Sequence, residues 1–222
     1  PRAARRGRAR QGGAAMSAIV FDRHGPTAWN MQALIQGQTD IPLSAEGRAE
    51  VRRWALRADF AGFEWYASPL ARARETAEIL GAAGLRTEPR LMEANWGEWE
   101  GWSLERLRED IGEIFAAMEA QGLDLTPPGG ESPRMVRARL SSWLAEVAPA
   151  QRPIVAVCHA GVVRAAYSLA TGWEMKKKAP LARPHAFAHL YELSPAGALT
   201  VSELNIPLLA PDAPEPHDRR DG

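Results

Sequence analysis

Two histidines follow short apolar segments of the chain, each in a position where it could take part in catalysis. Arg23 and His24 come directly after the run Ser17–Asp22, and His159 comes directly after the run Ile154–Cys158. Both runs are short and bounded by turn residues, which predicts buried strands. Ligands in open α/β sheets bind beyond the carboxyl ends of the strands. We therefore expect the two histidines to share one site.

Further groups suited to an anion occur in similar places. A third strand candidate, Phe63–Ala67, is followed by a helix that carries Arg72. Another helix is predicted to begin after His159, with Ala160 and Gly161 in its first turn, and a helix N-terminus favours negative charge. Forked guanidinium groups match the charged oxygens of a phosphoryl group. The pattern predicts an anion site built from two arginines and two histidines.

Such a site could transfer a phosphoryl group through a covalent histidine. A histidine can accept the group when one ring nitrogen is free and its tautomer is fixed. The departing alkoxide then needs a proton from a carboxyl group. Glu93, in the loop Leu91–Gly101, is the candidate for that acid. Each of these residues alone has an ordinary structural explanation, so the hypothesis depends on the whole combination.

Six short motifs follow one another in a fixed order over residues 17–170. They are RHGPTAWN at 23–30, QGQTDIPLS at 36–44, SPLARARETA at 68–77, LME at 91–93 with WEG at 99–101, PGGES at 128–132, and VCHAGVVR at 157–164. In this order they resemble the motifs of the histidine phosphatase superfamily, the phosphoglycerate mutase-like proteins. One such motif alone would be a weak signal, whereas six in order are a specific one.

The resemblance implies a role for each matching residue. His24 would be the nucleophile and His159 the second histidine of the site, while Glu93 would act as general acid and then as base for water. Arg23 and Arg72 would hold the phosphate. The other residues expected at the phosphate are Asn30, Gln36, Gly37, Ala160 and Gly161. The fold implied is a three-layer α/β/α sandwich around a mostly parallel sheet, with no metal and no other cofactor.

Two positions depart from the family's usual pattern. Pro26 stands where glutamate is most common, although proline also occurs there. Asp22 stands at the end of a buried strand, where an apolar residue is usual. Alternation places Asp22 on the sheet face opposite to Arg23, and a buried carboxylate needs a partner. We predict a buried Asp22 held by a basic or N–H group.

The region after the acid loop favours one branch of the family. The mutases carry a longer insertion there, whereas this chain passes directly into a predicted helix over 103–120. This resembles the phosphatases, including those that act on alpha-ribazole phosphate. We expect a phosphomonoesterase acting on a small phosphorylated metabolite. A cofactor-dependent phosphoglycerate mutase and a non-catalytic protein that binds through a phosphate pocket remain alternatives.

The segments expected to recognise the leaving group are 95–130 and 173–185. Trp96, Trp99 and Trp102 either stack on the substrate or pack the loop, and the sequence does not decide between these roles. Cys158 is interpreted as a small core residue.

The remaining elements follow from periodicity and caps. Ser44 is a predicted N-cap of a helix that reaches Ala58, and Ser132 begins an amphipathic helix. Further helices are predicted over 70–83 and 161–171, an exposed strand over 85–91, and a hairpin from 186–192 and 199–203. Strands alternating with helices predict one α/β domain over 17–206. Residues 1–16 and 207–222 are interpreted as a disordered leader and tail.

Composition limits the class of protein. The chain has 222 residues and equal numbers of basic and acidic residues, 27 of each. No run of eighteen apolar residues occurs, so no membrane span is expected. The single cysteine fits a reducing cytoplasm. Five arginines lie in residues 1–15 without an acid, but we interpret them as part of a disordered leader, not as a nucleic-acid arm. A monomer or a homodimer is expected.

Overall fold

A six-stranded mixed sheet forms the centre of the protein. The structure, a computed structural model, describes residues 15–182 and 185–208. The strand order is β3-β2-β4-β1-β5-β6. Strands β3, β2, β4 and β1 are parallel, and β5 runs antiparallel to both β1 and β6. The strands are β1 (Ser17–Arg23), β2 (Glu64–Ala67), β3 (Arg86–Thr87), β4 (Ile154–Cys158), β5 (Phe187–Leu193) and β6 (Leu199–Pro207).

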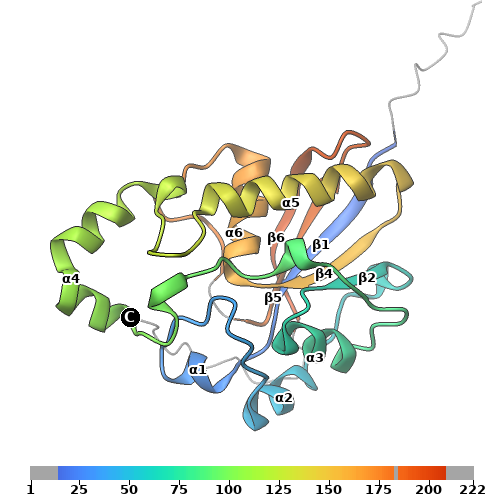
Figure 1. Cartoon of the computed structure of the whole chain (residues 1–222). Helices are drawn as coiled ribbons and strands as arrows, with labels where there is room; N and C mark the ends of the chain where they lie inside the picture. The colour runs from blue at the N-terminus through green and yellow to red at the C-terminus, as the bar shows by residue number, and fades with distance from the viewer. Residues whose placement is uncertain (1–14, 183–184, 209–222) are drawn as a thin grey trace, which may run out of the picture.

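Helices cover both faces of this sheet (Figure 1). The α-helices are α1 (Ala28–Met31), α2 (Ala45–Val51), α3 (Ala71–Ile79), α4 (Leu104–Glu119), α5 (Pro133–Val147) and α6 (Ala160–Thr171). Short 3-10 helices are η1 (Ala58–Phe60), η2 (Pro89–Leu91), η3 (Gly97–Trp99), η4 (Gly122–Asp124) and η5 (Ala148–Ala150). Figure 1 shows α5 and α6 on one face of the sheet, α2 and α3 on the other, and α4 extending to the side. The expected sandwich architecture is confirmed.

The period-2 alternation of β1 divides the core into two layers. Ile19 and Phe21 pack with residues of α5 and α6, including Trp143. Val20 faces the opposite way and packs with Val51 and other residues near α2 and α3. A third, smaller cluster of Trp99, Leu107 and Phe115 joins the loop after Glu93 to α4.

The parallel register of β1 and β4 brings the two predicted histidines together. Arg23 is level with Cys158 in this register, and the backbone N–H of His24 donates to the carbonyl of Cys158 at 3.0 Å. His24 and His159 therefore leave neighbouring strands at the same edge of the sheet. The turn after β2 starts α3 beside them, because the N–H of Ser68 donates to the carbonyl of Val157.

Several predicted boundaries were wrong for local reasons. Helix α3 ends at Ile79, not near Gly84, because Gly81 adopts a left-handed conformation with φ of 88° and closes the helix. Helix α2 ends at Val51, and the chain then turns so that the N–H of Ala55 donates to the carbonyl of Leu208. Strand β3 is two residues long, because Pro89 begins a 3-10 helix.

The predicted tail also begins too early. Pro207 belongs to β6, and Leu208 is fully buried and hydrogen-bonded to Ala186 and Ala55. The rest of the predicted tail, and most of the predicted leader, lie outside the described residues. Among the described helices, none is long and apolar enough to cross a membrane.

Candidate active site

His24 lies at the carboxyl end of β1, where hydrogen bonds at Gly25 hold the ring and the adjacent backbone. It is 3% exposed, and its Nδ1 lies 2.7 Å from the carbonyl oxygen of Gly25. A carbonyl only accepts hydrogen bonds, so this contact assigns the ring proton to Nδ1 and leaves the lone pair on Nε2. The N–H of Gly25 in turn donates to the hydroxyl of Thr76, which donates to the carbonyl of Arg72. The nucleophile segment is thereby tied to α3.

His159 lies directly against His24. The ring centroids are 5.1 Å apart, and His159 is fully buried. Neither of its ring nitrogens has a hydrogen-bond partner in the described part of the chain. Burial, together with the charge of Arg72, lowers the pKa of His159 well below its ordinary value. Burial, the closeness of His159 and the charge of Arg72 also lower the pKa of His24, so the neutral form of both rings is favoured near pH 7.

A large cavity opens at this edge of the sheet. Its volume is about 1450 Å³, and its lining at one end includes Arg23, His24, Arg72, Glu93 and Gly161. His159 is not among the lining residues, because it lies behind His24 in the protein interior. The predicted phosphate contacts Asn30, Gln36, Gly37 and Ala160 also line the cavity. The structure thus gathers the predicted site residues in one place.

Arg72 is fixed by the segment that precedes α2. Its Nη1 and Nη2 donate to the carbonyls of Thr39 and Gly37, at 2.9 and 2.7 Å. The side chain is fully buried, and its Nε has no hydrogen-bond partner in the described residues. A buried donor of this kind suits an oxygen of a bound anion. The amide oxygen of Asn30 instead accepts from Thr27 in a capping box, which leaves its amide nitrogen to face an anion.

Glu93 occupies the N-terminus of α6. Its carboxylate accepts from the N–H of Gly161, at 3.0 and 3.2 Å to the two oxygens, and from the N–H of Ala94 at 2.8 Å. The sequence predicted that the helix N-terminus would offer its N–H groups to a bound anion. The structure instead gives the Gly161 N–H to Glu93, because this carboxylate lies at the first turn of the helix. Gly161 therefore positions the Glu93 side chain.

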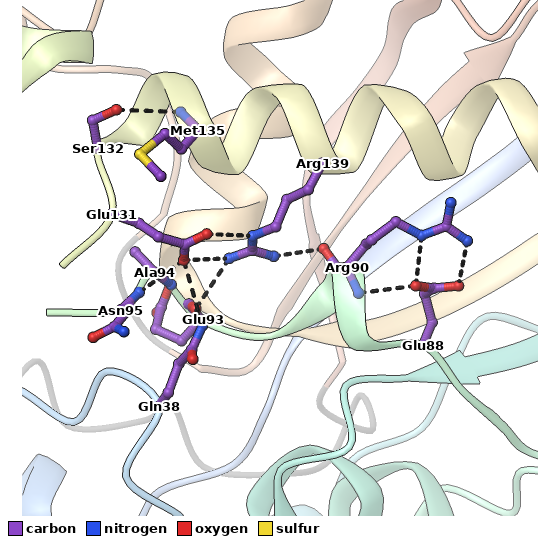
Figure 2. A network of polar contacts seen from close by, with 10 residues as sticks. All are labelled: Gln38, Glu88, Arg90, Glu93, Ala94, Asn95, Glu131, Ser132, Met135 and Arg139. Carbon is purple, nitrogen blue, oxygen red and sulfur yellow. Dashed lines mark hydrogen bonds and ion pairs between the residues drawn. The ribbon is translucent and has the colours of Figure 1, made fainter. Parts of the chain in front are cut away.

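The loop that carries Glu93 is fastened by a polar network (Figure 2). Arg139 of α5 donates to the carbonyls of Arg90 and Glu93, at 2.6 and 3.0 Å, and forms an ion pair with Glu131. Glu131 also accepts from the N–H of Asn95. The side-chain amide of Gln38 reaches the same carbonyl of Glu93 and the Glu131 carboxylate. These contacts fix the backbone on both sides of the acid.

The far end of the cavity is formed by α4 and by residues near 175. Leu104, Arg108 and Phe115 line it from α4, and Met175 and Lys178 from the other side. These residues belong to the segments 95–130 and 173–185, whose contact with the leaving group stays a prediction. Of the three tryptophans left open above, Trp96 lines the cavity, whereas Trp99 is buried against Phe115. Trp102 lies under the guanidinium of Arg106, 3.7 Å from the ring centroid.

Asp22 is buried as predicted, but the described residues do not include the basic or N–H partner that was predicted to hold it. It is 0% exposed, and neither oxygen accepts a hydrogen bond of ordinary geometry from the described residues. It shares the face of β1 that carries Val20, where residues of α2, α3 and neighbouring segments form an apolar cluster. Burial raises the pKa of Asp22 well above its ordinary value, opposed only by the nearby backbone N–H of Arg23. Burial therefore favours the neutral form of the carboxyl group.

The sequence missed a third histidine at the nucleophile. His185 Nδ1 lies 2.6 Å from the backbone carbonyl oxygen of His24, and the two ring centroids are 5.5 Å apart. His185 just precedes β5, which is antiparallel to β1. The start of an antiparallel strand lies level with the end of its neighbour. The direction of β5 was the signal that could have placed His185 here.

No group of three or more His, Cys, Asp or Glu side chains that could hold a metal ion occurs among the described residues.

Comparison with known proteins shows which family the chain resembles. The sequence model of the histidine phosphatase superfamily (branch 1) matches residues 19–204. A 2,3-bisphosphoglycerate-dependent phosphoglycerate mutase of Azorhizobium caulinodans is 34% identical over 161 residues, which cover 66% of this chain and 78% of the relative. Phosphoglycerate mutase-like protein 4 of Arabidopsis thaliana is 32% identical over 161 residues, 68% of this chain and 70% of the relative.

Solved structures point to the same family. A mycobacterial glucosyl-3-phosphoglycerate phosphatase superimposes with a TM-score of 0.69 at 25% identity, covering 85% of this chain and 98% of its own. A putative alpha-ribazole-5'-P phosphatase of Escherichia coli has a TM-score of 0.75 at 21% identity, covers 88% of this chain and 99% of its own, and shows the likeness of fold alone. With the family model matched over nearly all of the described residues, the chain belongs to the histidine phosphatase superfamily (branch 1).

Proposed function

We propose that this protein is a phosphomonoesterase that hydrolyses small phosphate esters through a phosphohistidine at His24. The observation that carries the proposal is the state of His24. Its Nδ1 proton is held by the Gly25 carbonyl, its ring is kept neutral by burial and nearby positive charge, and it lines the cavity beside Arg23 and Arg72. A neutral, oriented imidazole is a competent nucleophile.

In the first step, Nε2 of His24 attacks the phosphorus of the substrate. A P–N bond forms and the bond from phosphorus to the ester oxygen breaks. The departing oxygen takes a proton from the Glu93 carboxyl group, which Gly161 and Ala94 hold at the cavity wall. The guanidinium groups of Arg23 and Arg72 stabilise the charge that gathers on the three phosphoryl oxygens.

In the second step, water attacks the phosphohistidine. Glu93, now a carboxylate, takes a proton from that water, the P–N bond breaks, and inorganic phosphate leaves. The neutral His24 is regenerated. The lowered pKa of His24 favours this return, because the ring does not retain a proton that would block the next attack.

The size of the cavity supports water as the acceptor. A liquid water molecule takes about 30 Å³, so a cavity of about 1450 Å³ holds many of them beside a small ester. A mutase must keep water away from its phosphoenzyme while the substrate reorients. The same volume favours a leaving group larger than a simple alcohol, which contacts α4 and the residues near 175.

Hydrolysis of p-nitrophenyl phosphate in the presence of EDTA tests this proposal. The wild-type protein should turn over without added metal. His24→Ala should lose activity entirely, because no neighbouring group can accept the phosphoryl group. A wild-type protein that binds phosphate but releases no nitrophenol would favour the non-catalytic alternative.

The mutase alternative is kept because relatives at 32 to 34% identity carry mutase names. A mutase and a phosphatase differ in the ratio of the isomerisation rate to the rate of phosphate release. With 3-phosphoglycerate and a trace of the bisphosphate, a phosphatase releases inorganic phosphate faster than it isomerises the substrate. A mutase isomerises faster by orders of magnitude.

A further inference from the structure

We infer that Glu100 is a positioning residue for phosphate binding, and that it acts on Arg72 through the turn Gly37–Thr39. The inference rests on the proposed function only in that Arg72 is taken to bind the phosphate. Glu100 itself lies outside the set of residues that line the cavity.

The Glu100 carboxylate collects four donors from two segments of chain. Its Oε1 accepts from the backbone N–H groups of Gln38 and Trp96, at 2.8 and 3.1 Å. Its Oε2 accepts from the backbone N–H and the hydroxyl of Thr39, at 2.9 and 2.5 Å. A carboxylate that accepts several N–H groups at once makes strong, charge-assisted hydrogen bonds. Glu100 therefore fixes the backbone of the turn at two successive residues.

The same turn holds Arg72 from its other side. The peptide group between Gly37 and Gln38 bonds to both side chains, because its N–H donates to Glu100 and its carbonyl accepts from Nη2 of Arg72. The N–H of Thr39 likewise donates to Glu100, and the carbonyl of Thr39 accepts from Nη1 of Arg72. One turn thus lies between a carboxylate and a guanidinium and hydrogen-bonds to both. The position of Arg72 depends on where Glu100 holds this turn.

Gly37 lies so close to Glu100 that no side chain fits at this position. Gly37 has a φ of 51°, a conformation that favours glycine, and a Cβ at this position would overlap the Glu100 carboxylate. The turn therefore packs directly on Glu100. The residues next to this contact are also paired. The N–H of Gly101 donates to the carbonyl of Ile35, and the N–H of Ile35 donates to the carbonyl of Trp102.

Glu100 also acts on Arg72 through its negative charge. Burial lowers the pKa of Arg72, whereas the charges of Glu93, Asp40 and, to a smaller extent, Glu100 favour its charged form. An amide at position 100 would keep the size of the side chain. It would replace one acceptor oxygen by an NH₂ group that faces N–H donors, and the turn would have to move.

A double-mutant cycle on phosphate binding tests the inference. The dissociation constant of inorganic phosphate is measured by calorimetry for wild type, Glu100→Gln, Arg72→Ala and the double variant. Glu100→Gln should weaken binding about tenfold, the scale of one lost hydrogen bond to a charged group. In the Arg72→Ala background the same change should cost less than about twofold, because residues acting through one another are not additive.

Matched variants separate positioning from general damage to the fold. Glu88→Gln changes another carboxylate that accepts several hydrogen bonds, but one that lies away from the turn Gly37–Thr39. Glu88 accepts from the backbone N–H and from two guanidinium nitrogens of Arg90. It should lower the melting temperature and leave phosphate binding unchanged. Thr39→Val removes one donor to Glu100 and keeps the carbonyl that binds Arg72. It should weaken phosphate binding less than Glu100→Gln, and again only when Arg72 is present.

Equal losses from Glu100→Gln with and without Arg72 would overturn the inference, as would a Glu100→Gln protein that binds phosphate normally. If Glu100→Gln does not fold, an unchanged phosphate affinity in Thr39→Val overturns it instead. Failure of the proposed function looks different. In that case Arg72→Ala itself leaves phosphate binding unchanged, or every variant binds phosphate and the wild type hydrolyses nothing.

Discussion

At the scale of single residues, Arg72 is the group other than the nucleophile His24 whose loss should be most costly to the transition state. Its buried guanidinium lines the reacting end of the cavity and is held by two carbonyls. Arg72→Ala should lower kcat/KM by an amount that corresponds to a loss of about 3 kcal/mol or more of transition-state stabilisation, the scale of a lost oxyanion donor. Arg72→Lys should recover only part of this, because an ammonium cannot span the same forked geometry. A loss smaller than tenfold for the alanine variant would exclude Arg72 from the clamp.

Asp22 gives a prediction about stability and pH. Its pKa is raised in the folded state and ordinary, about 3.9, in the unfolded chain. The folded protein thus holds a proton that the unfolded chain releases. No penalty exists below about pH 4, and stability falls as the pH rises from there toward the raised pKa of the folded state. Asp22→Asn removes this penalty.

The measurement is the melting temperature of both proteins across pH. The gain of Asp22→Asn over wild type should be small near pH 4 and should grow toward pH 8. Because Asp22 and Arg23 point to opposite faces of the sheet, kcat should change little. A gain that is constant with pH, or a loss at pH 8, would show that Asp22 is ionised and partnered in the folded protein.

At the scale of elements, the acid loop depends on helix α5. Arg139 binds the carbonyls of Arg90 and Glu93 at the start of this loop, and also the Glu131 carboxylate (Figure 2). Arg139→Lys keeps the charge and loses the forked geometry, so Glu93 should be held less accurately. A misplaced acid matters most when the leaving group needs a proton. The variant should therefore lose more kcat with alkyl phosphates than with p-nitrophenyl phosphate, as should Glu93→Gln.

Arg134→Lys is the matched control on the same helix. Arg134 also makes a two-bond pair with a carboxylate, Asp124, but both side chains are exposed. This control should leave the ratio between the two substrates as in wild type. If Arg139→Lys also leaves the ratio unchanged, the network does not position Glu93.

The sequence predicted best those features that depend on local order along the chain. His24 and His159 each end an apolar run, and the parallel register of β1 and β4 then suffices to bring them together. The helix start at Ser44 was predicted from its cap, and helices were also predicted to begin at Ser103 and Ser132. In the structure each of these serines is an N-cap and accepts a hydrogen bond from the first turn of its helix. Helix ends were harder, because either Gly81 or Gly84 could have closed α3.

Features that depend on tertiary arrangement were not predictable in the same way. Asp22 was given a partner by the general rule that buried charges are paired, whereas its burial in the structure raises its pKa and favours the neutral form. The helix N-terminus at Gly161 was expected to bind the substrate's anion, but the folded chain places Glu93 there. His185 and Glu100 act through backbone groups of distant segments, which no local pattern reveals.

At the scale of the whole molecule, the arrangement divides two tasks between two regions. The edge of the parallel sheet supplies the invariant chemistry of a phosphoryl group, from β1, β4 and α3. The segments around α4 and residue 175 enclose the remaining volume and would meet the leaving group. Substitutions such as Arg108→Ala or Lys178→Ala should therefore alter the preference among phosphate esters and spare p-nitrophenyl phosphate. Equal losses for all esters would show that this region acts in the chemical step.

The central claim is that the phosphoryl group passes from the substrate to His24 and then to water. The most direct test is rapid quenching of the wild-type protein during turnover, followed by mapping of the phosphorylated peptide. The account predicts an acid-labile, base-stable phosphohistidine at His24 that forms and decays as fast as inorganic phosphate is released. Steady turnover without any phosphohistidine, or with the phosphoryl group on another residue, would contradict it.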